Sequence, residues 1–199
     1  MDGRREALAA APVDWATQWA PYSDDTYEEA LALLRPGQLI LDIGAGDLRF
    51  ARRAVARGCR VIAVEQQATV VERGRRGGPL PPGLTVVVAD ARQWPFPAAL
   101  GAAVLLMRHC ADYALYVARL RAVGCPTLIT NARWRLGVEV VPLGTAGAYS
   151  EAEIGWYACV ACGRTGFTAG DPSELTAAVE RRVRNVEGCP ACSPTRVAR

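Results

Sequence analysis

The sequence predicts an α/β fold, in which a mostly parallel sheet carries helices on both faces and a small module follows at the C-terminal end. Three observations support this prediction. Short apolar runs alternate with segments of helical periodicity over residues 36–150, as in strands joined by crossover helices. The first apolar run ends in a glycine-rich turn. Beyond residue 150, four cysteines fall into two C-x-x-C pairs, which indicates a segment of a different kind.

The composition fits one α/β domain with a small addition. The chain has 199 residues, 51% of them hydrophobic, and a net charge of +3 that does not by itself demand a nucleic-acid partner. No apolar run approaches the roughly 20 residues of a membrane span, so we expect no membrane partner. Seven cysteines, of which four are paired in motifs, indicate a reducing compartment, and we expect a cytoplasmic protein. The expected parts are an N-terminal helical cap, residues 1–35, a sheet domain, residues 36–150, and a cysteine module, residues 151–199.

The expected cap contains a helix over 27–34, for which the segment that begins at Ser23 offers an N-cap. Trp15 and Trp19 precede it. These aromatic residues either cover an open edge of the domain or close over a ligand.

The first strand is expected at Leu39–Ile43, because this run is apolar except for Asp42. Glycines at 44 and 46 then allow a tight turn and close approach of a ligand to the backbone. Asp47 caps or opens a helix over 48–57. A strand, a glycine turn and a helix N-terminus together form a corner that binds mononucleotides.

Further strands and helices follow in alternation, and polar residues stand where the strands end. A carboxylate at the end of the second strand, Glu65, can accept hydrogen bonds from both hydroxyls of a ribose. Asp90 ends the third strand, where an adenine edge would lie. The third glycine of G-x-G-x-x-G is replaced by Arg49, which favours a ligand with ribose and adenine but no pyrophosphate. The expected strands are 60–64, 84–89, 102–107, 127–130 and 138–143, the last near an edge, and the expected helices are 68–75 and 111–123.

Over about its first 145 residues, the sequence resembles the class I, Rossmann-like S-adenosylmethionine-dependent methyltransferases. The resemblance depends on Leu41–Asp47, Glu65 and Ala89–Ala91. It implies that Asp42 and the turn hold the methionine part of the cofactor, that Glu65 binds the ribose and that the Asp90 segment meets the adenine. The family often has glycine where this chain has Leu48, and a Rossmann-like domain for another nucleotide, or for none, is the alternative. The implied cofactor-binding residues are Asp42, Gly44, Ala45, Gly46, Glu65, Asp90 and Ala91.

The methyl acceptor is expected to bind where the fourth and fifth strands end, a region that we call the acceptor side. His109, the one histidine of the chain, follows the fourth strand and could act as a general base near neutral pH, or could simply bond to backbone at a helix N-terminus. Candidate substrate contacts are Arg108, Asn131 and Arg133, with surface exposure of the arginines as the alternative. The family's Asn/Asp-Pro-Pro-aromatic motif is absent here, which counts against methylation of an exocyclic base amine by that route.

The two C-x-x-C pairs are Cys159–Cys162 and Cys189–Cys192, separated by 26 residues. Four thiolates suit a tetrahedral Zn²⁺ and leave no open position, so the module resembles a zinc ribbon with a structural metal. Two disulfides or a redox pair are the alternatives. A last antiparallel strand from this segment could continue the sheet. The remaining cysteines, Cys59, Cys110 and Cys125, are expected to be buried.

A helix is expected over residues 171–185, carrying Arg181, Arg182 and Arg184. It either contacts phosphates or forms a solvated face of a stabilising clamp. The leading hypothesis is a methyltransferase whose acceptor is RNA, with a protein or small molecule as close alternatives. The second is a non-catalytic, methyltransferase-like scaffold that holds a partner through its zinc ribbon.

Overall fold

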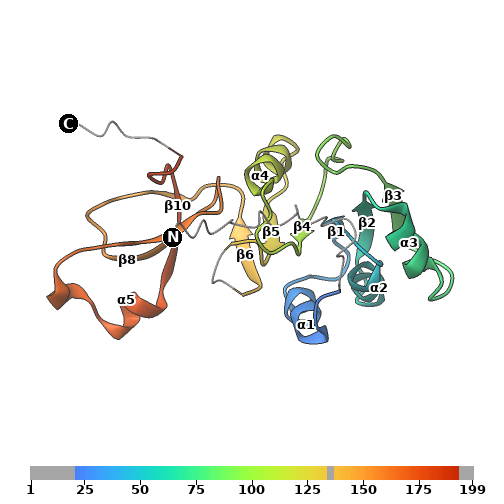
Figure 1. Cartoon of the computed structure of the whole chain (residues 1–199), viewed down its shortest axis with the longest axis horizontal. Coiled ribbons are helices and arrows are strands. Elements are labelled where there is room, and N and C mark those ends of the chain that lie inside the picture. The colour runs from blue at the N-terminus through green and yellow to red at the C-terminus, as the bar shows by residue number, and fades with distance from the viewer. Residues whose placement is uncertain (1–20, 134–136, 193–199) are drawn as a thin grey trace, which may run out of the picture.

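The computed structural model describes residues 21–133 and 137–192, which form two sheets (Figure 1). Trp15 and Trp19, which were predicted either to cover an open edge or to close over a ligand, lie outside the described residues. No described helix has the length and hydrophobicity that a membrane crossing requires.

The larger sheet has six strands in the order β3-β2-β1-β4-β5-β6. The first five are parallel, and β6 pairs antiparallel with β5 at the edge, as its proline predicted. This arrangement confirms the predicted fold class. The fourth strand stops earlier than expected. The strands are β1 (Leu39–Ile43), β2 (Arg60–Glu65), β3 (Leu84–Val88), β4 (Ala102–Leu105), β5 (Thr127–Thr130) and β6 (Glu139–Pro142).

Helices cover both faces of this sheet, and each face has its own core (Figure 1). Buried side chains of α1, α2 and α3 join one core, and those of α4 join the other. The hydroxyl of Ser23 accepts a hydrogen bond from the Thr26 amide, so the predicted N-cap is confirmed. The helices are α1 (Asp24–Ala32), α2 (Arg49–Ala56), α3 (Ala68–Arg75) and α4 (Tyr113–Ala122).

The cysteine module has a sheet of its own, in the order β7-β10-β8-β9, so the predicted continuity with the larger sheet is wrong. The predicted helix over 171–185 is also largely wrong, because only five of its residues are α-helical and Arg184 lies on a strand. Residues 183–186 pair in parallel with residues 156–159 of β8, so this segment joins the sheet of the module instead of continuing the helix. The elements are β7 (Gly147–Ala148), β8 (Gly155–Cys159), β9 (Thr165–Thr168), a 3-10 turn (Pro172–Glu174), α5 (Ala177–Arg181) and β10 (Val183–Glu187).

The module packs directly onto α4. Val160 is buried in the α4-side core of the larger sheet. Gly163, in the first cysteine turn, has φ +75°, and a Cβ there would lie 2.8 Å from the ring of Tyr113. Arg121 of α4 forms an ion pair with Glu187 of β10. The first cysteine turn therefore forms part of the support of α4.

Candidate functional site

The carboxyl ends of β1, β2 and β3 lie side by side, and the predicted cofactor residues are placed there. The turn after β1 folds back onto β2, where the amides of Gly44 and Ala45 both donate to the Val64 carbonyl at 2.8 and 3.1 Å. Gly44 and Gly46 have φ values of +71° and +56°, in the left-handed region that glycine adopts without strain. The turn therefore needs its glycines, as predicted.

Glu65 anchors this turn from the end of β2. Its carboxylate is 6% exposed and accepts hydrogen bonds from the amides of Gly46, at 3.0 Å, and Gln67, at 2.9 Å. A carboxylate has about four acceptor positions, so two remain for ligand hydroxyls. Glu65 thus holds the turn and keeps capacity for a ribose.

Asp42 lies beneath the turn and is almost fully buried, at 3% exposure. Its Oδ2 has no hydrogen-bond partner among the described residues. Burial, and next the negative charge of Glu65, raise the pKa of Asp42 to about 7. A buried carboxyl with an unpaired oxygen suits a cationic or hydrogen-bonding ligand group above it.

This raised pKa predicts a dependence of stability on pH. Asp42 keeps its proton to about pH 7 when folded but loses it near pH 4 when unfolded, so the native state binds more protons in between. Folding stability contributed by this group therefore falls as pH rises from about 4 to 7. We expect Asp42→Asn to raise the free energy of unfolding at pH 8 by about 1–3 kcal/mol, with no gain at pH 4, in urea titrations.

Asp112→Asn is the matched control, because it removes one charge from a side chain that is 43% exposed. We expect it to leave the pH dependence of unfolding unchanged. A wild-type stability that stays flat between pH 4 and 7 would rule out the buried, protonated Asp42.

Asp90, beyond the end of β3, has a different environment. Both of its carboxylate oxygens accept hydrogen bonds from the Arg92 guanidinium, and one also accepts the Arg92 amide. Hydrogen bonds from the side chain and then the backbone of Arg92 lower the pKa of Asp90. The neighbouring Ala91 is buried at 7% exposure. Arg92 was not predicted as a site residue, because its role becomes visible only through the hydrogen bonds that its side chain donates to Asp90.

The backbone accommodates a leucine at position 48, where the family often has glycine. Leu48 precedes α2 with φ +65°, so a leucine holds the left-handed conformation that a glycine would hold more easily. The Leu48 side chain is fully buried, which offsets the strain. The predicted helix start at 48 shifts by one residue, and Asp47 accepts a hydrogen bond from the Arg49 amide at 3.2 Å.

The loop after β4 carries the predicted acceptor-side residues. Arg108 and His109 are both exposed, and His109 has φ +58°. The amide of Arg108 donates to the hydroxyl of Tyr22 at 2.8 Å, across 86 residues of sequence. Tyr22 therefore ties the segment before α1 to the acceptor side, a contact that no local sequence signal reveals. Cys110, predicted as buried, is only partly so.

Asn131 and Arg133 follow β5 and are both buried, at 4% and 2% exposure. The Arg133 guanidinium forms an ion pair with Glu139 of β6, which Nε contacts at 2.6 Å. Surface exposure of Arg133, the alternative to substrate contact, is wrong. The Asn131 amide has no hydrogen-bond partner among the described residues, on either its oxygen or its nitrogen.

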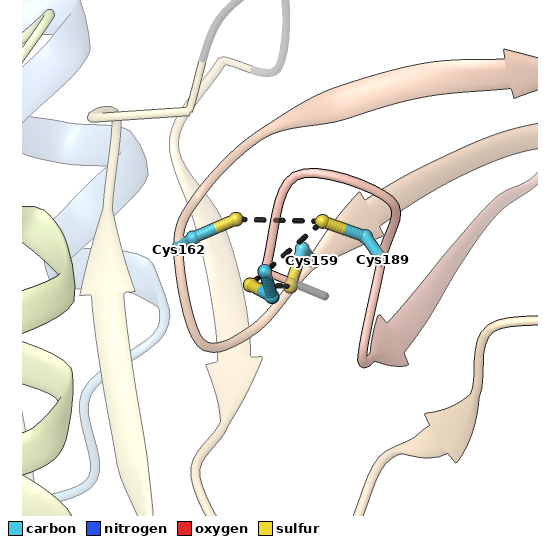
Figure 2. Close-up of side chains that lie close together, drawn as sticks. Cys159, Cys162 and Cys189 are labelled. Carbon is cyan, nitrogen blue, oxygen red and sulfur yellow. Dashed lines mark hydrogen bonds between the residues drawn. The ribbon is translucent and has the colours of Figure 1, made fainter. Parts of the chain in front are cut away.

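The four cysteines of the module converge on one point. Figure 2 shows the side chains of Cys159, Cys162 and Cys189 close together. Their sulfur atoms all lie within 4.8 Å of one another, with Sγ–Sγ distances of 3.6 Å for Cys159–Cys192, 3.5 Å for Cys162–Cys189 and 3.8 Å for Cys189–Cys192. A disulfide bond is about 2.05 Å long. Tetrahedral Zn²⁺ with bonds of about 2.3 Å separates its sulfurs by roughly 3.8 Å. The donor set and spacing therefore fit zinc.

Comparison with known proteins agrees with this geometry. Residues 40–124 match a family described as "Methyltransferase domain". A search of curated proteins found no match. An RNA methyltransferase from Salinibacter ruber, solved with S-adenosyl-L-homocysteine, is 17% identical with a TM-score of 0.50, over 56% of this chain and 76% of that one. A proposed RNA methyltransferase from Pyrococcus horikoshii is 14% identical with a TM-score of 0.53, over 63% and 67%.

The alignment covers only part of some relatives. A proposed S-adenosylmethionine-dependent methyltransferase from Listeria monocytogenes is 14% identical with a TM-score of 0.46, over 54% of this chain and 52% of that one, so the chain spans about half of its length. The two structures with TM-scores of 0.50 and 0.53 support the fold. The family match covers the glycine turn and the strand ends that carry Glu65 and Asp90. Residues 40–124 thus match a methyltransferase domain, the sheet has the Rossmann-like fold of these methyltransferase structures, and the four cysteines form a cluster that fits a zinc-ribbon-like site.

Proposed function

We propose that this protein transfers a methyl group from S-adenosylmethionine to RNA. One observation carries the proposal. The glycine turn after β1, Glu65 at the end of β2 and Asp90 after β3 stand at the carboxyl ends of three adjacent strands. This order matches a ligand with a small polar group, a ribose and an adenine in succession.

The cofactor would be held by groups that still have hydrogen-bonding capacity. Asp42 and the turn take the methionine part, with the unpaired Oδ2 of Asp42 beneath it. Glu65 takes the ribose hydroxyls. The adenine lies along the backbone of Asp90 and Ala91, because the Asp90 carboxylate is occupied by Arg92. When bound, the cofactor supplies an activated methyl group, and the protein contributes position and exclusion of water.

RNA is the proposed acceptor for two reasons. Proteins described as RNA methyltransferases share the fold with TM-scores of 0.50 and 0.53. Arg108 also presents an exposed cation on the acceptor side of the site. In the module, Arg181 and Arg182 are exposed, whereas Arg184 pairs with Glu153 and supports the fold. A protein or small-molecule acceptor is the other outcome of the test below.

His109 is the proposed general base, because it is exposed on the loop that ends β4. His109→Asn suits the test, since asparagine tolerates a φ of +58° better than most residues. We expect turnover to fall by about 100-fold, in the usual range for a general base, with the Kd for S-adenosylmethionine unchanged by calorimetry. A variant that keeps full turnover would remove His109 from the mechanism.

The proposed metal is a structural zinc. Four thiolates fill a tetrahedral site and leave no place for a reacting water. Burial disfavours the Cys159 thiolate, but hydrogen bonds from the amides of Cys162 and Cys189 and from neighbouring thiols lower the pKa of Cys159 to about 7. Free thiols and a zinc site both favour a reducing compartment, and we propose a cytoplasmic location.

The acceptor is identified by incubating zinc-loaded protein with radiolabelled S-adenosylmethionine and, separately, RNA, protein and metabolite fractions. Label in RNA that disappears on treatment with ribonuclease is the expected result. Label in the protein or metabolite fraction would contradict the RNA assignment. Cofactor binding without transfer to any fraction would favour the second hypothesis, a methyltransferase-like scaffold.

A further inference from the structure

The most informative group outside the proposed cofactor contacts is the Asn131 amide. The residue is 4% exposed, and neither Oδ1 nor Nδ2 has a partner among the described residues. A primary amide can make about four hydrogen bonds, and burying it with none is costly. Such a group in a folded protein calls for a specific explanation, and a ligand is one.

Strand register places Asn131 level with the glycine turn. Asp42 pairs with Val104, and Val104 pairs with Ile129. Two residues further along the strands, Gly44 and Asn131 therefore stand at the same height, two strand spacings or about 10 Å apart. The amide is within reach of an acceptor that meets a methyl group held over the turn.

Asn131 also shares a sheet face with Asp42. Side chains alternate along a strand, so Asn131 falls on the side of Ile129 and Asp42 on the side of Ile40. Ile40 and Ile129 belong to the same core, the one that α1 covers. Two buried side chains with polar atoms that have no partner within residues 21–133 and 137–192 thus occur on one face, at the carboxyl end of the sheet.

The strand order decides which ligand Asn131 meets. The cofactor residues proposed above occupy β3, β2 and β1, whereas β4 and β5 lie on the opposite side of β1. Asn131 therefore lies on the acceptor side, at the carboxyl end of β5. Arg108 is an exposed cation beyond the end of the adjoining strand, β4. An anionic acceptor with a hydrogen-bonding edge suits this pair.

We propose that Asn131 selects the acceptor base of an RNA by pairing its Oδ1 and Nδ2 with an adjacent donor and acceptor on the base edge. This inference rests on the proposed function. An asparagine amide matches adenine in this bidentate way, through an amino group and a ring nitrogen. Met107 lies over Gly44, with its Cε 2.8 Å from the position of a Gly44 Cβ, and its flexible thioether can move to admit a base.

The test measures binding of four ten-nucleotide homopolymers, of A, C, G and U, by fluorescence anisotropy in the presence of S-adenosylhomocysteine. We expect the wild type to bind one homopolymer at least about tenfold tighter than the others, in the usual range for a bidentate pair. Asn131→Ala should bind all four within about twofold of one another. Asn131→Asp should lose the original preference, because it keeps the acceptors but lacks the donor.

Asn185→Ala is the matched control, because Asn185 is the other asparagine of the chain, lies on β10 and also has a buried unpaired oxygen. It should keep the base preference of the wild type. Asn131→Ala should also keep its melting temperature, since it removes an unpaired amide. A drop in melting temperature would instead reveal a structural role and overturn the proposal.

Calorimetry with S-adenosylhomocysteine distinguishes failure of the proposed role of Asn131 from failure of the proposed function. Wild type and Asn131→Ala should bind it within about twofold of each other. Binding by the wild type without any base preference, or a preference that survives in Asn131→Ala, overturns the role of Asn131 alone. Absence of binding by the folded wild type overturns the proposed function itself. Preference for a peptide over every homopolymer would also overturn the base-edge proposal.

Discussion

Purified protein should contain one zinc ion per chain, and removal of that ion should unfold the cysteine module. The described part of the module has a small core of its own, because the buried residues of its separate cluster are Cys159, Val186 and Cys189. Two of these three residues are proposed ligands. Structural zinc contributes roughly 10–16 kcal/mol to small domains of this kind, which is more than the rest of the module can replace.

The measurement combines metal analysis with hydrogen exchange. Cys189→Ser should lose zinc and lose protection over β8 and β10, while β1 and β2 stay protected. Cys110→Ser is the control, because Cys110 lies outside the cluster, and it should retain one zinc. Metal-free protein with full protection, or four thiols paired as disulfides, would contradict a zinc site.

Because α4 contacts the first cysteine turn through Tyr113 and Gly163, we expect loss of metal to weaken protection of α4 as well. Its N-terminal end follows the loop that carries His109. Metal removal should therefore affect the acceptor side before it affects the glycine turn.

Replacing Glu65 should have the second large effect, on cofactor affinity. The carboxylate holds the amides of Gly46 and Gln67 and is proposed to bind the ribose. Glu65→Ala removes all of these interactions, and we expect the Kd for S-adenosylmethionine to rise at least about 100-fold, or about 2.8 kcal/mol. Glu65→Gln should raise the Kd nearly as much, because the glutamine NH₂ group would face a backbone amide and cannot accept its hydrogen bond.

Glu72→Ala provides the control for Glu65. It removes the same charge from an exposed position on α3, where Glu72 forms an ion pair with Arg75. Its Kd should stay within about twofold of the wild type. Circular dichroism should show that each variant is folded, so that the Kd values can be compared. An unchanged Kd in Glu65→Ala would place the cofactor elsewhere.

The sheet domain was predictable because its strands carry a strong local signal. Leu39–Ile43 and Thr127–Thr130 occur as expected, since buried parallel strands are nearly continuous apolar runs. The glycine turn, Glu65 and Asp90 were predictable for the same reason, because strand ends fix their positions. The C-x-x-C spacing likewise predicted the convergence of the cysteines.

Other features depend on contacts that sequence spacing does not encode. Arg184 falls on β10, because pairing with β8 outweighs the helical tendency of its neighbours. The bond of Tyr22 to the Arg108 amide spans 86 residues. The burial of Arg133 depends on Glu139 from the next strand. Arg92 covers Asp90 through its side-chain conformation, which neighbouring sequence leaves open.

The carboxyl ends of β1, β2 and β3 are proposed to bind S-adenosylmethionine. Isothermal titration calorimetry of zinc-loaded wild type with S-adenosylmethionine measures this binding. We predict one site per chain with a Kd in the micromolar range. Absence of binding heat at several temperatures, by protein shown to be folded and to contain zinc, would contradict the claim.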